Sequence, residues 1–212
     1  MSKSYTERKI AWAEKMRNQG TRAAAARSQD RLPPGQHIVQ KLPVLDLGIH
    51  PSLPKDQWRL EISGLVEAPI SLDWAALGAL PQEEKTSDFH CVTTWSRFGC
   101  RWLGVPFSAL LDFVRPMADA RFVFYTAHDG YTTNTPIHVL THPDALLAHT
   151  LDGEALSTEH GGPLRVILPQ LYAWKGAKWI KRIVFGATDA QGYWEERGYS
   201  MFGDPWLNDR FS

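Results

Sequence analysis

Alternating apolar and polar positions predict a strand that ends at Gly64. Apolar side chains at positions 58, 60 and 62 alternate with charged or hydroxyl-bearing ones, the pattern of a strand with one buried face. Asp129-Gly130 predicts a hairpin turn into a strand at residues 131–133. Runs rich in β-branched and aromatic residues predict further strands at 121–126, 164–168 and 180–185.

Helical periodicity is clearest after Pro106. Apolar residues at positions 107, 110, 111 and 114 fall on one face, and Pro116 ends the run. A short helix is also predicted over residues 72–80, with Ser71 as its N-cap and Asp73 in its first turn. We predict another from Thr141 through His149.

The first thirty residues have a thin apolar pattern. Residues 4–19 favour a helix that ends at Gly20, and the Arg/Ala run that follows is unpatterned. We therefore predict a peripheral helical arm at residues 1–30 and one domain at residues 31–212. The order of strands and helices predicts an α+β fold with mixed β-sheets and short helices.

Composition excludes several classes of partner. Lys plus Arg and Asp plus Glu both number 23 in 212 residues, so no net charge favours nucleic acid or an anionic membrane. No run of about eighteen apolar residues predicts a membrane span, and the first residues lack the pattern of a signal peptide. Two cysteines make no disulfide framework. We expect a soluble, cytoplasmic protein.

The candidate chemistry centres on residues 88–96, which read Asp-Phe-His-Cys-Val-Thr-Thr-Trp-Ser. The thiolate of Cys91 is a soft ligand suited to zinc, copper, iron–sulfur clusters or molybdenum. It is also a nucleophile where a nearby positive charge lowers its pKa. A cysteine that merely packs in the core is the alternative without chemistry.

This segment resembles the metal-ligand segment of sulfite-oxidase-like molybdopterin oxidoreductases. The short, haem-free branch, related to the catalytic subunit of the periplasmic methionine sulfoxide reductase, carries His-Cys-Val-Thr-x-Trp-Ser in this form. Further motifs recur in order, so that the resemblance covers roughly residues 31–212: Gly-Val-Pro at 104–106, Asp-Gly-Tyr-Thr at 129–132, His-Gly-Gly-Pro-Leu-Arg at 160–165, Tyr-Ala-Trp-Lys-Gly-Ala-Lys-Trp at 172–179 and Gly-Tyr-Trp-Glu at 192–195.

The resemblance implies a sulfite-oxidase molybdopterin-binding fold and a molybdenum–molybdopterin cofactor with Cys91 as the protein ligand of the metal. It implies that Arg97 and Tyr131, with Thr93, face the substrate. The implied cofactor contacts are Gln36, His37, His90, Cys91, Thr126, His160, Arg165, Gly176, Ala177 and Lys178. Arg165 offers a planar fork for a phosphate, Lys178 a point charge, and the glycines a close backbone approach.

The sequence also departs from the family. Sulfite oxidases carry a different run after the cysteine and an extra dimerisation domain, while methionine-sulfoxide-reducing relatives have glutamate where Thr93 stands. Best-characterised relatives often have asparagine at the position of His160. We therefore expect two-electron oxygen-atom transfer on a small substrate, such as a sulfoxide, an N-oxide or a sulfite-like anion. Without a haem or flavin motif, an external electron carrier is expected.

Three alternatives remain open from the residues alone. A zinc site could combine Cys91, Cys100, His90 and His128, although the nine-residue gap between the cysteines fits no common zinc spacing. A cysteine hydrolase could use Cys91 with one of several histidines as its base. A pterin-binding module without turnover would keep Arg165 and Lys178 but should have lost the thiolate.

Overall fold

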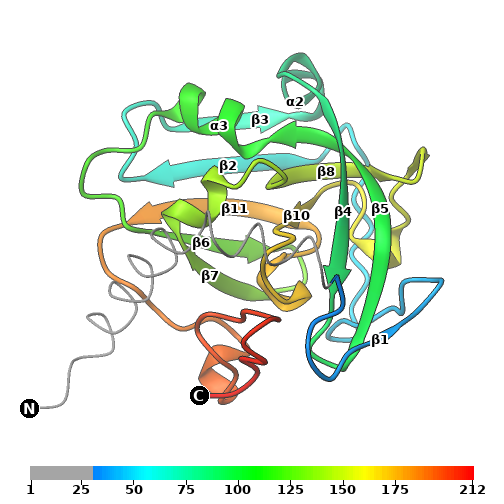
Figure 1. Cartoon of the computed structure of the whole chain (residues 1–212). Coiled ribbons are helices and arrows are strands. Elements are labelled where there is room, and N and C mark those ends of the chain that lie inside the picture. Colours follow the sequence, from blue (N-terminus) through cyan, green and yellow to red (C-terminus); the bar gives the residue numbers. More distant parts are fainter. Residues whose placement is uncertain (1–30) are drawn as a thin grey trace, which may run out of the picture.

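The computed structural model describes residues 31–212, and the helix predicted within residues 1–30 lies outside them. Two β-sheets form the fold (Figure 1). One has five strands in the order β3-β2-β11-β6-β7, in which β2 and β11 run parallel and the other neighbours antiparallel. Its strands are β2 (Arg59–Gly64), β3 (Ile70–Asp73), β6 (Phe122–Ala127), β7 (Thr132–Pro136) and β11 (Ile180–Gly186).

The second sheet has six strands and is also mixed. Its path is β1-β5-β8-β10, with β4 paired to β5 and β9 to β8; β1 and β5 are parallel. Its strands are β1 (His37–Ile38), β4 (Glu83–His90), β5 (Trp95–Pro106), β8 (Leu146–Leu151), β9 (Glu154–Ala155) and β10 (Arg165–Ile167). The two mixed sheets confirm the α+β prediction.

Helices are few and short within residues 31–212. They are the α-helices α2 (Trp74–Ala79) and α3 (Phe107–Val114) and the 3₁₀ helices η1 (Ile137–Thr141), η2 (Thr158–His160), η3 (Ala173–Lys175) and η4 (Glu195–Arg197). None is both long and apolar enough to cross a bilayer. The N-cap of α2 is Asp73, not Ser71 as predicted, because the Asp73 carboxylate accepts the Ala76 N–H at 2.8 Å.

The predicted helix from Thr141 to His149 is wrong. Thr141 is instead the last residue of η1, and the segment from Leu146 to His149 belongs to β8, between β5 and β10 in the second sheet. Leu146, Leu147 and Ala148 are all fully buried there. Both faces of this central strand are covered, so its sequence lacks the alternation that marks a half-buried strand.

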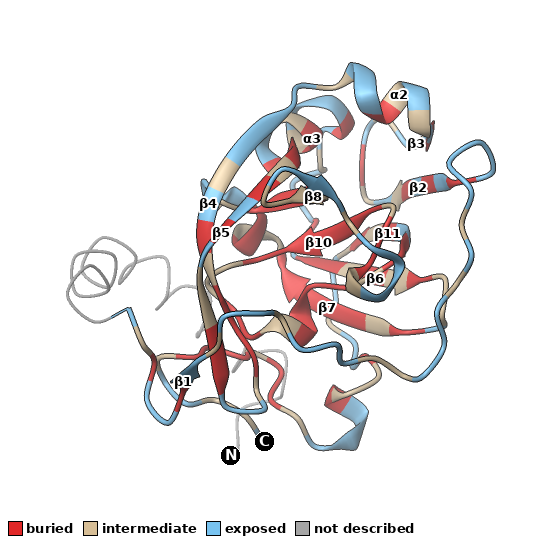
Figure 2. Ribbon diagram, turned by 90° about the vertical axis from the view of Figure 1, so that its right-hand side faces the viewer, coloured by how far each residue is buried: buried red, intermediate tan, exposed pale blue. Residues whose placement is uncertain are grey.

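Buried apolar side chains form two clusters. The larger one packs α3 and the five-stranded sheet against each other and includes Trp58, Phe107 and Ile183. The smaller one lies on the six-stranded sheet around Phe89, Cys91 and Trp102. Figure 2 shows the buried residues running along the facing strands of both sheets. Cys91 is therefore part of a packed wall.

Candidate active site

Cys91 lies in the tight loop that joins β4 to β5. The Cys91 N–H donates to the Trp95 carbonyl at 2.9 Å, and the Thr94 N–H donates to the Cys91 carbonyl at 3.1 Å. Thr94 closes this loop with a φ of 75°, a conformation that non-glycine residues adopt only when their surroundings hold it. The hairpin thus fixes the backbone that carries the thiol.

The environment of the thiol keeps it protonated in the free chain. Cys91 is 5% exposed, and its Sγ lies 3.1 Å from Thr93 Oγ1. Burial raises the pKa of Cys91, while the Thr93 contact and the charge of Arg210 act in the opposite direction. Nothing that the structure describes activates it as a nucleophile at neutral pH.

A cavity of about 340 Å³ opens beside Cys91. Six residues that the sequence proposed for the site line it together: Cys91, Tyr131, His160, Arg165, Gly176 and Lys178. Thr93 lines it as well, as predicted for the substrate side. Residues far apart in the sequence therefore converge on one space of the size that a cofactor with a small substrate needs.

Arg165 and Lys178 supply the positive charge of the cavity. Arg165 is 5% exposed, and its Nη1 donates to the His160 carbonyl at 2.9 Å. Its Nε is buried and has no hydrogen-bond partner among residues 31–212. Burial lowers the pKa of Arg165 to about 10. Lys178 Nζ donates to the Glu159 carbonyl at 3.0 Å and pairs with Asp46 at 3.2 Å. Burial, followed by the charge of Arg165, lowers the pKa of Lys178.

Glycines bring the backbone close to these cations. A Cβ on Gly161 would lie 3.1 Å from Cβ atoms of both Arg165 and Lys178, and φ at Gly161 is +105°. A Cβ on Gly176 would lie 2.5 Å from the Val166 carbonyl oxygen. Only glycine fits both positions without strain or a shift of the backbone. Gly176 lines the cavity itself, and Gly161 packs behind Arg165 and Lys178.

Tyr131 and a set of aromatic side chains form another part of the wall. Tyr131 Oη donates to the Trp174 carbonyl at 2.5 Å, and burial raises the pKa of Tyr131 far above its usual value. Trp174 and Trp194 line the cavity on either side of Tyr199, with ring centroids 5.4 and 5.0 Å from the Tyr199 ring. The Tyr131 hydroxyl is thus neutral, and its hydrogen bond goes to a backbone carbonyl.

Several predicted cofactor residues lie just outside the cavity wall. Gln36 Nε2 donates to the Cys91 carbonyl at 3.1 Å and so supports the loop from behind. His37 is exposed in β1, where its N–H donates to the Thr94 carbonyl. His90 points to the opposite side of β4, with its Nδ1 2.8 Å from Ser96 Oγ and its ring against Trp206. These residues contact the loop that carries the thiol rather than line the cavity.

Arg97, Thr126 and Ala177 are also placed differently from the prediction. The Arg97 guanidinium pairs with Asp152 and is absent from the cavity lining. Thr126 faces Thr132 across the β6–β7 pair, and Ala177 contributes its backbone carbonyl to the Val166 N–H. Direct contact of these side chains with a ligand stays a prediction that the geometry does not support.

Some lining residues were not singled out from the sequence. Trp174, Trp194 and Trp179 lie within the quoted motifs, but their exposure to a cavity could not be separated from ordinary core packing. Asp46 comes from a segment without any motif. Its contact with Lys178 spans 132 positions in the sequence, so only the tertiary fold reveals it.

The residues present fit a cofactor that has an anionic tail and brings most of its own metal ligands. The site offers one buried thiol, a desolvated arginine that has no carboxylate partner among residues 31–212, and glycines where the backbone approaches most closely. These features suit a thiol-bound metal and an anionic tail. Within residues 31–212 no three His, Cys, Asp or Glu side chains gather around a common point. This geometry speaks against the zinc alternative, which needs such a set from the protein.

The hydrolase alternative also finds little support. His160 shares the cavity with Cys91, but its Nε2 donates to the Leu42 carbonyl at 3.2 Å and its Nδ1 lies 2.9 Å from Ser157 Oγ. Both ring nitrogens are occupied, so the ring offers no free base to the thiol.

Comparisons with known proteins identify the family of this chain. A family profile for the oxidoreductase molybdopterin binding domain matches residues 47–194. The chain is 40% identical over 183 residues to the "uncharacterized oxidoreductase YuiH" of Bacillus subtilis, covering 86% of this chain and 92% of that protein. It is 34% identical to the putative protein-methionine-sulfoxide reductase subunit YedZ1 of Azospira oryzae, covering 69% of this chain and 55% of that protein.

One further relative and one solved structure match this chain over only part of their own length. The protein-methionine-sulfoxide reductase catalytic subunit MsrP of Campylobacter jejuni is 29% identical, covering 69% of this chain and 54% of MsrP. The sulfane dehydrogenase SoxCD of Paracoccus pantotrophus has the same fold, with a TM-score of 0.61 at 22% identity over 70% of this chain and 42% of that one. The chain belongs to the sulfite-oxidase-like family of molybdopterin-binding oxidoreductases.

Proposed function

We propose that this chain is a molybdenum-cofactor-dependent oxidoreductase that carries out two-electron oxygen-atom transfer on a small substrate, with Cys91 as the protein ligand of the metal. The observation that carries the proposal is one cavity lined by a buried thiol and by two desolvated cations, Arg165 and Lys178. The cofactor, when bound, supplies the oxygen-atom transfer and the redox chemistry.

The chain's own residues bind and orient the cofactor. Arg165 and Lys178, with the backbone at Gly161 and Gly176, would hold the anionic tail. The hairpin loop holds Cys91 in a fixed direction, and packing around the thiol excludes water from it. Tyr131, bound to the Trp174 carbonyl, holds its proton at Oη at every physiological pH.

The distribution of charge favours a neutral substrate over a dianion. Among the described residues that line the cavity, the arginine and lysine side chains are those of Arg165 and Lys178. The anionic tail of the cofactor would bind both. Asp46, Asp129 and Glu159 line it as well and repel anions. Arg97, the cation proposed for an oxyanion, pairs with Asp152 instead. A sulfoxide or an N-oxide therefore suits this cavity better than sulfite.

Reduction of such a substrate balances with two electrons and two protons, R₂SO + 2 H⁺ + 2 e⁻ giving R₂S and water. We propose that the electrons come from an external carrier. We also propose that the enzyme works in the cytoplasm, since the described cysteines, Cys91 and Cys100, are both free thiols.

The first test is metal and pterin analysis of protein purified from a host that makes the cofactor, beside the variant Cys91→Ser. We expect molybdenum and pterin near one per chain in the parent, and loss of dye-coupled sulfoxide reduction with a changed metal absorption spectrum in Cys91→Ser. Cys100→Ser is the matched control, because Cys100 is equally buried but absent from the cavity lining. It should keep the parent's spectrum.

An active Cys91→Ser variant with an unchanged spectrum would contradict the assignment of the metal ligand. Parent protein that contains zinc, or no metal despite ample molybdate, would contradict the cofactor itself. Sulfite turnover at rates far above those of sulfoxides and N-oxides would leave the cofactor assignment standing and refute the preference for a neutral substrate.

A further inference from the structure

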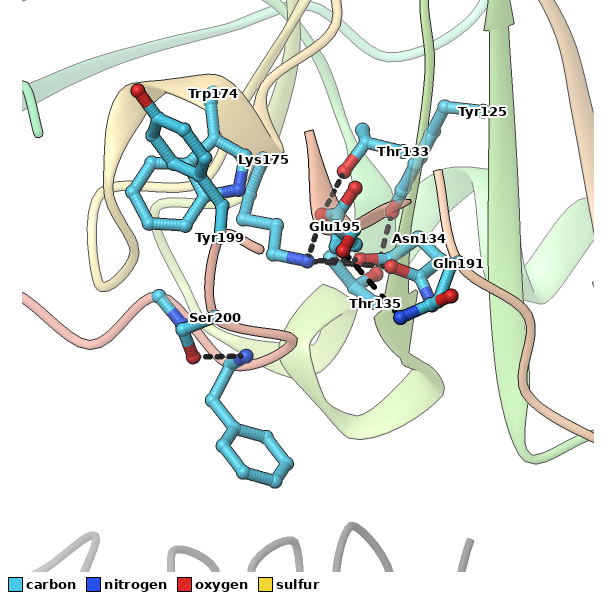
Figure 3. Close-up of polar contacts among 12 residues, drawn as sticks. Tyr125, Thr133, Asn134, Thr135, Trp174, Lys175, Gln191, Glu195, Tyr199 and Ser200 are labelled. Carbon is cyan, nitrogen blue, oxygen red and sulfur yellow. Dashed lines mark hydrogen bonds and ion pairs between the residues drawn. The ribbon is translucent and has the colours of Figure 1, made fainter. Parts of the chain in front are cut away.

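A fully buried ion pair lies directly behind the aromatic wall of the cavity. Lys175 Nζ donates to Glu195 Oε1, and both side chains are 0% exposed (Figure 3). Lys175 is the last residue of η3, and Glu195 is the first of η4. The pair joins two loops that are twenty residues apart in the chain.

Both partners are also tied to β7. Lys175 Nζ donates to the backbone carbonyl of Asn134 at 3.2 Å and to its side-chain oxygen at 3.3 Å. Thr133 Oγ1 donates to Glu195 Oε1 at 2.9 Å. The two loops are therefore pinned to one strand at a single buried point, as Figure 3 shows.

Each charged residue is flanked in sequence by residues of the cavity wall. Trp174 and Gly176 surround Lys175, and Trp194 precedes Glu195; all three flanking residues line the cavity. Since the charged side chains point away from the cavity, the pair fixes the backbone from which both tryptophans project. The tryptophan rings meet at Tyr199, so a shift of either loop would change the shape of that wall.

Stability alone does not explain this pair. Removing two charges from water costs several kcal/mol per ion, and well-packed uncharged residues of similar volume often replace such pairs without loss. Burial lowers the pKa of Lys175, and Glu195 acts in the opposite direction. Glu195 Oε2 is buried without a hydrogen-bond partner among the described residues. The folded chain therefore keeps this pair at a cost in the free energy of folding. In some proteins such a buried polar or ionic group fixes one arrangement of the chain rather than adding stability.

We propose that the Lys175–Glu195 pair is a positioning device that sets the spacing of Trp174 and Trp194, and thereby the fit of the substrate against the aromatic wall. The substrate part of this inference rests on the proposed function; the positions of the rings do not. Neither residue touches the reacting atoms, so both are positioning residues.

The test is the double variant Lys175→Met/Glu195→Gln, which removes both charges, nearly keeps their volumes and leaves an acceptor for Thr133. We expect the unfolding midpoint and the pterin content to stay close to those of the parent. KM for a dialkyl sulfoxide, with a reduced dye as donor, should rise on the order of tenfold while kcat stays within about twofold.

A second readout needs neither metal nor substrate. In cofactor-free protein labelled with 5-fluorotryptophan, the ¹⁹F resonances of Trp174 and Trp194, assigned by single Trp→Phe changes, should shift or broaden. Those of Trp58 and Trp102, which are buried elsewhere in the core, should not. Because no turnover is involved, this result stands even if the proposed substrate class fails.

Arg182→Met/Glu61→Gln is the matched control. It applies the same type of change to an ion pair between β11 and β2 whose side chains are 46% and 49% exposed. It should leave KM and all tryptophan resonances unchanged.

The proposal is overturned if the double variant shows the parent's resonances and KM. If the double variant does not fold, the single variant Glu195→Gln is measured in the same way. Failure of both to fold would also overturn the proposal, since the pair would then be a requirement of the fold itself.

Discussion

Arg165→Met should stabilise the cofactor-free chain while it weakens cofactor binding. Burial lowers the pKa of Arg165 from its usual value to about 10, which corresponds to roughly 3 kcal/mol of cost for its charge in the folded state. The hydrogen bond to the His160 carbonyl returns about 1.5 kcal/mol. Methionine can replace the guanidinium contacts with Phe89 and Trp102 by sulfur–aromatic contacts.

The net gain is therefore on the order of 1 to 2 kcal/mol, or a rise in unfolding midpoint of about 2 to 8 °C for a chain of this size. The folded-state pKa of Arg165 is the lower one, so the cost is fully present at neutral pH. It is relieved only as the pH rises through about 10. Thermal unfolding of cofactor-free protein at neutral pH measures the whole effect.

Cofactor retention should move in the opposite direction. A lost charge-assisted contact to an anion costs about 1.5 to 3 kcal/mol, so pterin retained after gel filtration should fall at least severalfold. Arg182→Met, an exposed arginine in β11, should change the free energy of unfolding by less than about 0.5 kcal/mol and leave pterin content unaltered. A lower unfolding midpoint for Arg165→Met would show that Arg165 stabilises the fold. Unchanged pterin retention would show that Arg165 does not bind the cofactor.

Two other predictions concern Gly176 and the thiol of Cys91. In Gly176→Ala the added Cβ would lie 2.5 Å from the Val166 carbonyl oxygen, so we expect a loss of about 1 to 3 kcal/mol in the free energy of unfolding with a parallel loss of pterin; denaturant titration and pterin analysis measure both. Burial raises the pKa of Cys91, so iodoacetamide should label it slowly at neutral pH and faster as the pH rises, and bound cofactor should protect it. Mass spectrometry would follow this labelling. Cys100, whose pKa is raised to about 11, is the slower reference. Rapid labelling of Cys91 that is independent of pH would contradict the buried-thiol environment.

Local patterns predicted the elements whose burial is one-sided. The alternation at β2 and the apolar stripe of α3 both reflect a face packed on the larger core, and both predictions are confirmed. β8 was mistaken for a helix because an apolar run without alternation suits either structure. β5 was not foreseen at all, since charged residues such as Arg101 interrupt its pattern at an exposed face.

The alternation of side chains also explains why some predicted site residues do not line the cavity. Successive residues of a strand point to opposite faces, so Phe89 and Cys91 line the cavity while His90 between them turns to the other side of β4. Arg97 lies two residues into β5, which runs away from the loop, and Asp152 binds its guanidinium. Closeness in sequence to Cys91 was therefore a poor guide to closeness in space.

Three of the predicted residues that line the cavity share a physical property that no spacing reveals. Cys91 has a raised pKa, Arg165 carries a buried charge without a carboxylate, and Lys178 is held by Asp46 although burial lowers its pKa. Burial disfavours the charged form of each in the folded chain alone, and an anionic, thiolate-binding group would offset that cost for all three. Their meeting in one cavity is therefore a stronger argument for a bound cofactor than any one of the residues alone.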